Sequence, residues 1–425
     1  MKSSLFHLKS WGSAACLLSL LMSATGALCA KPVAMAPVAM APMAMAPVAM
    51  APVAMAPVAM APVAMAMAPV AMAMAMAQQK YKVFNLGNDP QDLALNDSGQ
   101  VVGQALNGLN SYAFLFSASG SRQNLTPSLP AGTTYSGALD INNSGLIVGY
   151  FRAPSTKGEL HAFALANGVG RDLNDFLPAG STASVATSVN TWGQITGYAS
   201  TGKDPIYGNL DHAFLFSNGT AIDIHGLMPQ LYGYAAISSH GAAINSSAQI
   251  AGTFRARGRS GFVDDHAFLY TNSTGEVLNL EELLPSTTVS SSADAINDAG
   301  QVVGTFLVSS PTARYESHAF LYTSATGVMQ DLDGWLPAGF ADSYATSINN
   351  KGQILINADR LERGVLRSHA FLLSDGVLQD LNGLMPSTSW LAYSADDINN
   401  NGQIAGIGSQ SLQSAAFLMT PHGKR

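Results

Sequence analysis

Residues 328–373 read VMQDLDGWLPAGFADSYATSINNKGQILINADRLERGVLRSHAFLL, and this stretch decides the fold of the chain. It contains four short apolar runs separated by turn signals, at residues 328–332, 344–348, 353–357 and 369–373. The turn at 349–352 is Asn-Asn-Lys-Gly, and Asn and Gly tolerate the positive φ that tight hairpins require. No run has the length or the period of a helix. The stretch therefore predicts a four-stranded antiparallel unit.

Three motifs recur in fixed order through residues 80–425. The first is an Asn that opens a turn, at Asn96, Asn142, Asn190, Asn245, Asn297, Asn349 and Asn399. The second is His-Ala-Phe, at His161, His212, His266, His318 and His369. The third is an Asp-Leu or Asn-Leu pair followed by Leu-Pro or Met-Pro. The asparagines lie 46 to 55 residues apart, so the region holds seven copies of one unit.

The fourth run of each copy is apolar on both of its faces. In residues 212–216, His, Phe and Phe point one way while Ala and Leu point the other. A strand that is covered on both faces fits a sheet packed between two other sheets, as in the blades of a propeller. We therefore expect residues 80–425 to form an all-β, seven-bladed β-propeller of four-stranded blades. A β-solenoid is the alternative, although it would need capping segments that the sequence does not show.

The two ends of this region carry complementary strands. Residues 81–86 match the first run of the repeat, and residues 416–419 match the fourth. If a blade begins at the fourth run, we expect Phe417 to pair beside Phe84, so that the two ends close the ring together.

The first 79 residues differ in composition from the rest. Residues 1–30 have the parts of a signal peptide: two lysines, an apolar stretch and small residues before cleavage at Ala27 or Ala30. Residues 31–79 repeat Pro-Val-Ala-Met-Ala and predict an extended linker, because Pro disrupts a helix every five residues. Both cysteines fall in the signal segment, so a disulfide-free mature protein is expected in the periplasm, at the cell surface or secreted. No membrane insertion is expected once the signal is removed.

The charge balance limits the partners. Three of the 20 basic residues precede residue 80, which leaves 17 basic against 27 acidic residues in the repeat region. Such a balance argues against a nucleic-acid binder, which needs a basic excess to neutralise phosphates. We expect a monomer whose partner is an extracellular polymer or protein.

The three motifs, as His-Ala-Phe-Leu-Tyr, Gln-Asp-Leu-Asn and Ile-Asn-Asn-x-Gly-Gln-Ile-x-Gly, resemble the HAF-repeat family of bacterial extracellular repeat proteins. The resemblance covers about residues 81–420 and implies export and a repeated β fold, with no catalytic residues. The sequence departs from the pattern at Tyr112 and Ala415 in place of His, at Ala248 in place of the turn Gly, and at Ile356 in place of the closing Gly.

The repeated residues favour a structural role. Equivalent His residues around a ring lie too far apart to share one metal ion, and each is expected to bond a neighbouring turn. The Asn-rich turns weakly resemble calcium loops but carry too few carboxylates. No catalytic motif is present, and with no cysteine in the repeat region there is no thiol nucleophile. We predict no cofactor or metal, and the balance favours a protein that is not an enzyme. The alternative is a propeller lyase or hydrolase acting on an extracellular polymer.

The connections between the third and fourth runs are the part of the copies that does not repeat. We expect these connections on one ring face, together with the Leu-Pro loops. These segments carry ten of the 17 basic residues. We call the group on copies four to six the arginine arc: Arg255, Arg257, Arg259, Arg314, Arg360, Arg363 and Arg367, with Tyr315. Because loops on a rigid scaffold often bind ligands, the arc predicts a binding module for an anionic glycan, peptide or surface polymer.

Overall fold

The computed structural model describes residues 81–422 except 89, 108–109, 118–119, 179, 232, 259–260, 310–314 and 387–389. The expected signal segment 1–30 and linker 31–79 lie outside the described residues. Within the described part of the chain, no helix is long and apolar enough to cross a membrane.

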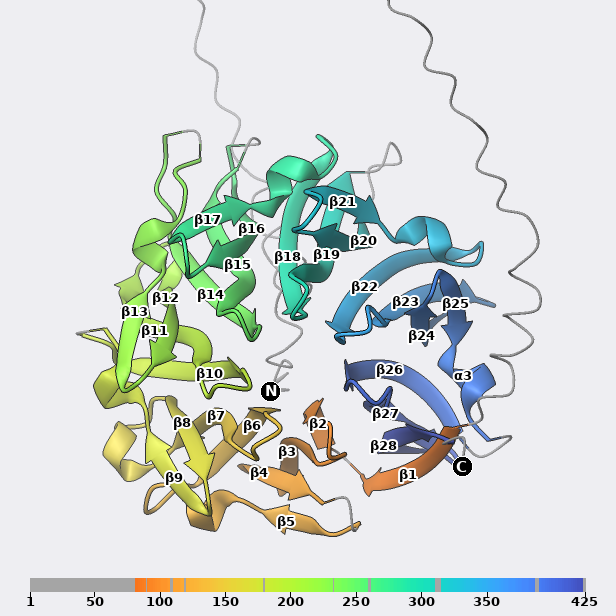
Figure 1. The fold of residues 1–425 in the computed structure, drawn as a ribbon, viewed down its shortest axis with the longest axis horizontal. Helices are drawn as coiled ribbons and strands as arrows, with labels where there is room; N and C mark the ends of the chain where they lie inside the picture. Colours follow the sequence, from red (N-terminus) through yellow and green to blue (C-terminus); the bar gives the residue numbers. More distant parts are fainter. Residues whose placement is uncertain are drawn as a thin grey trace, which may run out of the picture.

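The strands form seven four-stranded antiparallel sheets that stand as blades around a ring (Figure 1), which confirms the seven-bladed propeller. From the inner strand outward, blade one holds β2 (Pro90–Leu95), β3 (Val101–Asn107), β4 (Asn110–Phe116) and β5 (Arg122–Asn124). Blade two holds β6 (Tyr135–Ile141), β7 (Ile147–Arg152), β8 (His161–Ala166) and β9 (Val169–Asp172). Blade three holds β10 (Ala183–Val189), β11 (Ile195–Asp204), β12 (Gly208–Ser217) and β13 (Thr220–Asp223).

The remaining blades follow the same order. Blade four holds β14 (Ser238–Ile244), β15 (Gln249–Arg257), β16 (Val263–Thr271) and β17 (Glu276–Asn279). Blade five holds β18 (Thr288–Ile296), β19 (Gln301–Ser309), β20 (Tyr315–Thr323) and β21 (Val328–Asp331). Blade six holds β22 (Phe340–Ile348), β23 (Ile354–Glu362), β24 (Val365–Ser374) and β25 (Val377–Asp380). Blade seven holds β26 (Trp390–Ile398), β27 (Ile404–Gln410), β28 (Gln413–Pro421) and β1 (Tyr81–Gly87).

Single-turn helices lie in connections that sequence patterns predicted to be helix-free. They are η3 (Thr126–Ser128), η4 (Pro154–Thr156), η5 (Asn174–Phe176), η6 (His225–Leu227), η7 (Leu280–Leu283), η8 (Asp333–Trp335) and α3 (Leu381–Leu384). All but η4 lead from the outer strand of one blade to the inner strand of the next. Such turns are too short for helical periodicity to reveal them.

The sequence repeat and the structural blade are offset by one strand. The first run of the quoted stretch forms β21, which pairs with β20 at the outer edge of blade five, while the second run begins blade six. The blade therefore begins at the second run and not at the fourth. The strands β23 and β24 extend beyond their predicted bounds, because their hairpin pairing continues from Ile354↔Leu373 to Glu362↔Val365. β22 is also longer than predicted, because it pairs with β23 as far as Phe340↔Arg360.

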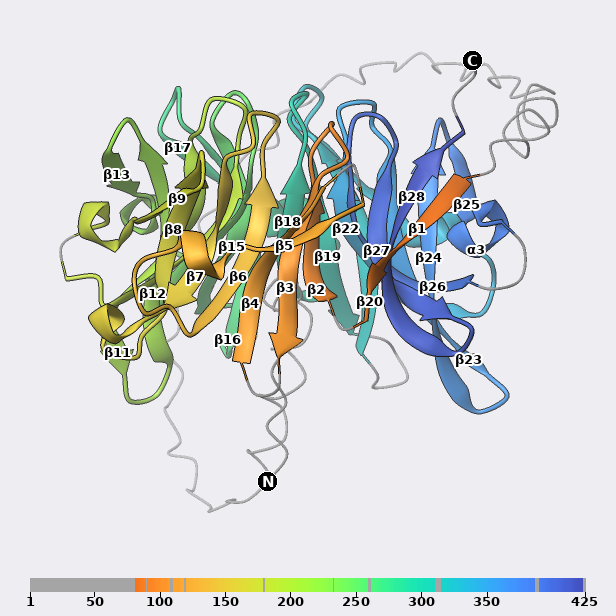
Figure 2. The ribbon, with the colours of Figure 1, turned by 90° about the horizontal axis from the view of Figure 1, so that it is seen from below.

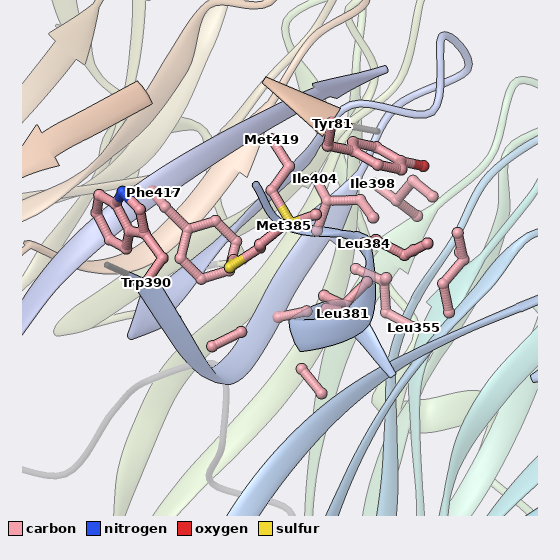
Figure 3. Packing of buried hydrophobic residues seen from close by; sticks show 14 of the residues in the cluster. Tyr81, Leu355, Leu381, Leu384, Met385, Trp390, Ile398, Ile404, Phe417 and Met419 are labelled. Atoms are coloured by element: carbon pink, nitrogen blue, oxygen red, sulfur yellow. The ribbon is translucent and has the colours of Figure 1, made fainter. Parts of the chain in front are cut away.

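The chain ends close the ring as expected, with a register one residue from the predicted one. β1 pairs antiparallel with β28, so that Phe84 lies opposite Leu418 and Asn85 opposite Phe417. Tyr81 belongs to the same core cluster as Phe417 and Met419, between blades six and seven (Figure 3). Burial raises the pKa of Tyr81 to about 12, since the charged phenolate would lose its hydration.

The two ring faces differ. The tight turns that follow the repeated Asn and those that precede each outer strand lie on one side, which we call the turn face. The hairpins between the second and third strands of each blade, such as β23–β24, lie on the opposite side, which we call the loop face. Figure 2 shows the β23–β24 hairpin projecting beyond the loop face, at the lower right.

Candidate functional site

The repeated asparagines form a closed ring of hydrogen bonds near the axis. Each Nδ2 donates to the backbone oxygen of the equivalent Asn in the next blade, at 2.9 to 3.2 Å. The ring closes from Asn399 to Asn96 at 2.9 Å. Each Oδ1 also accepts two backbone N–H groups of its own turn, as Asn297 does from Ala299 and Gln301. The motif therefore ties all seven blades together as well as shaping each turn.

The repeated histidines are held by the third motif. The Nδ1 of His161, His212, His318 and His369 lies 2.8 to 2.9 Å from the carboxylate of the Asp that precedes a Leu, or Ile224 in the case of His212. His266 bonds Glu281 instead, at 2.9 Å. The other oxygen of the Asp accepts a backbone N–H two residues further on, as Asp172 does from Asn174. Among the described residues, no group of three or more His, Cys, Asp or Glu side chains could hold a metal ion.

Sequence analysis missed a column of serines that joins neighbouring blades. Each Oγ accepts the backbone N–H of the Ala in His-Ala-Phe, or of its equivalent, from the preceding blade at 2.8 to 3.0 Å; they are Ser136, Ser184, Ser239, Ser291 and Ser343. All five also bond the single-turn helix that precedes them, as Ser184 bonds Asn174. A Ser-x-Ala or Ser-x-Gly pattern in the second run could have revealed the column.

The arginine arc is partly neutralised by carboxylates of its own hairpins. Arg255 makes a two-pronged contact with Asp265, at 2.9 and 3.2 Å. Arg360 bonds Glu362, and this hydrogen bond holds the pKa of Glu362 below its usual range. Arg257 lies over the Tyr234 ring, 4.8 Å from its centroid. Arg259 and Arg314 lie outside the described residues. Arg363 and Arg367 are exposed on the β23–β24 hairpin.

Exposed apolar side chains accompany these arginines along the loop face. We call them the apolar rim: Ile206, Phe262, Tyr315, Leu361, Val365, Leu366 and Leu412, exposed by 41 to 94%. They come from the hairpins between the second and third strands of blades three to seven. The predicted Tyr315 thus shares the loop face with exposed apolar side chains that the charge-based prediction did not include.

Leu412 is the most exposed member of the rim and is also strained. It is 94% exposed, with φ +71° at the β27–β28 turn, next to Ser411 at φ +51°. Such turns favour Asn and Gly, because a branched side chain is crowded at positive φ. Strain combined with full exposure of an apolar side chain points to a functional constraint.

Two polar clusters lie between neighbouring blades. Tyr150 Oη donates to Gln104 Oε1 at 2.7 Å, and Gln104 Nε2 donates to Asp92 at 2.8 Å. In the second cluster, Asp211 stands between Ser200 and His240 and bonds both. Burial would raise the pKa of Asp211, but the hydrogen bonds from His240 and Ser200 outweigh it and lower that pKa. Because the carboxylate separates Ser200 from the imidazole, His240 cannot take the serine proton, and the cluster is not a nucleophilic triad.

Burial raises the pKa of Asp294, a half-buried residue on the inner strand β18, to about 7, and Ser292 is the one hydrogen-bond partner of its carboxyl among the described residues. Asp294→Asn is therefore expected to raise stability at pH 8 and leave it unchanged near pH 4. Between the ordinary pKa of 3.8 and 7 the folded chain binds more protons than the unfolded one, so rising pH destabilises the wild type. Calorimetry should show a gain in Tm of about 2–4 °C at pH 8. A gain that is the same at both pH values would contradict this.

The sequence matches no protein-family model and no curated protein. Among solved structures, the β-propeller domain of the Trilobed protease from Pyrococcus furiosus is 9% identical, with a TM-score of 0.49, over 78% of this chain and 95% of that one. A puromycin-hydrolyzing peptidase of Mycobacterium tuberculosis is 12% identical, with a TM-score of 0.47, over 82% of this chain and 52% of that one.

Trypanosoma rangeli sialidase is 10% identical, with a TM-score of 0.36, over 79% of this chain and 55% of that one. This chain thus spans about half the length of the sialidase and of the peptidase. Similarity at this level transfers no activity to the chain, so its function has to be argued from its own residues.

Proposed function

We propose that the chain is an extracytoplasmic, non-enzymatic binding or scaffold module, and that its apolar rim docks a polypeptide that carries apolar and acidic side chains. The apolar rim is the observation that carries the proposal. Soluble domains rarely expose apolar side chains together, and where they do the surface usually contacts a partner. The export signal and the three HAF-like motifs support a place among the extracellular HAF-repeat proteins.

The arginines have a secondary role in this proposal. Arg255 and Arg360 already bond carboxylates of their own hairpins, which weakens their pull on a distant anion. Arg363 and Arg367 are exposed beside Leu361 and Leu366 and can pair with acidic groups at the edge of the contact. An apolar contact flanked by cations suits a polypeptide better than a uniformly anionic polymer.

The combined variant Leu361→Ser, Val365→Ser, Leu366→Ser is expected to weaken partner binding at least about tenfold, since each exposed leucine loses an apolar contact. Peptides selected from a random phage library on the mature wild type supply the ligands, and titration calorimetry gives their Kd. Val169→Ser, Val328→Ser is the matched control, because both valines are exposed, by 71% and 56%, at the turn-face ends of their strands. Equal Kd values for both variants would refute the proposal, as would binding to phosphatidylglycerol vesicles alone.

The alternative, a lyase or hydrolase for an extracellular polymer, would use Asp294 as its acid or base. A pKa of about 7 suits such a group. Turnover of a polysaccharide that is abolished in Asp294→Asn would favour this alternative over the binding module.

A further inference from the structure

A pocket of about 410 Å³ opens on the turn face between blades five and six. Trp335 at the end of η8 forms one wall, with Gln301 and Gln330 from β19 and β21 beside it. Lys351 and Asp375 come from two tight turns of blade six. The volume lies within the range of roughly 300–1,000 Å³ that small-ligand pockets occupy. This pocket lies on the face opposite the apolar rim.

The backbone that carries the indole is held in place, and the indole is available to a ligand. The η8 turn is closed by the backbone hydrogen bond from Trp335 to Leu332 and is anchored to blade six by Ser343, which donates to Asp333 at 2.8 Å. Trp335 is 40% exposed, and its Nε1 has no hydrogen-bond partner among the described residues. A platform whose position is fixed in advance loses little entropy when a ligand stacks on it.

Gln301 has a free donor where four of its five glutamine equivalents do not; the fifth, Gln100 in blade one, likewise only accepts through its Oε1 among the described residues. In four other blades the corresponding Gln Nε2 bonds a Ser or Thr hydroxyl: Gln194, Gln249, Gln353 and Gln403. Gln301 Oε1 accepts from Asn297 at 2.8 Å, but its Nε2 bonds no other described residue. The pocket thus contains an unused amide donor next to an exposed indole.

The corresponding positions between other blades are closed or lack the platform. Leu227, Leu283 and Leu384 stand where Trp335 stands. The equivalent Phe176 is covered by Arg171, 4.1 Å from its ring centroid. The combination of indole and amides occurs, among the described blades, at this junction alone. It is therefore not a by-product of the repeat.

We propose that this pocket binds a neutral pyranose unit of a glycan. The C–H face of a sugar ring packs on an aromatic face, and amides can donate to and accept from its hydroxyls. Lys351 and Asp375 place one charge of each sign at the pocket, so no net field selects an anion or a cation. The proposal goes beyond the polypeptide docking of the loop face and does not depend on it.

Intrinsic fluorescence of the mature chain tests the site. Trp11 lies in the signal segment, and Trp390 is 9% exposed, so in a Trp192→Phe background Trp335 is the exposed reporter. We expect one of chitotriose, cellotriose, maltotriose or mannotriose to shift its emission saturably, with a Kd of about 1 mM or tighter. The triple-serine rim variant should keep this affinity, which separates the site from the loop face.

Trp335→Leu gives the matched comparison, because leucine already stands at this position at three other blade junctions. Calorimetry with the same sugar should show at least about a tenfold loss of affinity with Tm changed by less than about 2 °C. Gln301→Leu should weaken binding similarly, whereas Trp192→Ala, 76% exposed at a turn outside the pocket, should not.

Three results would overturn the proposal. The first is that none of the four sugars shifts Trp335 emission, or that binding survives in Trp335→Leu. The second is that only an acidic sugar such as trigalacturonate binds. The third is that removing residues 31–79 changes Trp335 emission while sugars do not, which would assign the pocket to the proline-rich segment of the same chain.

Discussion

A chain that begins at Pro90 is expected to melt at least about 10 °C lower than one that begins at Lys80, or to lose its cooperative transition. β1 is the outer strand of blade seven, and its loss leaves β28 with an unpaired edge that favours aggregation. Tyr81 and Leu86, exposed by only 3% and 2%, would leave the cores between blades six and seven and between blades seven and one. Calorimetry and ultracentrifugation of the two chains provide the measurement.

Point variants separate strand closure from chain length. Tyr81→Ala should cost about 3 kcal/mol because it empties a buried aromatic site. Phe84→Ala on the same strand should cost less than about 1 kcal/mol, since Phe84 is 36% exposed. Equal melting of the chains from Lys80 and Pro90 would show that β1 does not hold the ring closed.

The fold was predictable because the same local signals occur seven times. Asn-x-x-Gly segments predict tight turns, and strands that are apolar on both faces, such as 212–216, predict sheets covered on both sides. The offset between repeat and blade was not predictable from these signals. The offset depends on which strand residues 328–331 pair with. The short turn at 324–327 brings them beside β20 of the preceding blade.

The candidate sites were predictable only in part. Charge counting found Arg363 and Arg367, but it could not show that Arg255 and Arg360 are bonded within their own hairpins. The pocket at Trp335 combines residues from 301 to 376 that meet only when two blades pack. The serine column was visible as a pattern, but its meaning depends on the neighbouring blade.

Each repeated asparagine of the ring is expected to stabilise the fold by a similar amount. Substitution of one of them measures that contribution. Asn297→Ala removes the oxygen that accepts two backbone N–H groups, at 3.1 and 3.0 Å. It also removes the amide that donates to the Asn349 carbonyl at 3.0 Å and to Gln301 Oε1 at 2.8 Å. Because Asn297 is 3% exposed, water cannot fully replace these partners. We expect a loss of about 4 kcal/mol, at roughly 1 kcal/mol for each of these bonds, measured by urea unfolding.

Asn297→Asp separates the contribution of the turn bonds to stability from that of the bond between blades. Aspartate keeps the acceptor for the turn, but it replaces the donor with an oxygen that faces the Asn349 carbonyl and Gln301 Oε1. Its destabilisation should therefore grow as pH rises through the carboxyl pKa, while that of Asn297→Ala should not change. Asn350→Ala, an exposed residue of the neighbouring turn, should cost less than about 1 kcal/mol. If Asn297→Ala costs no more than Asn350→Ala, the asparagines shape their turns without joining the blades.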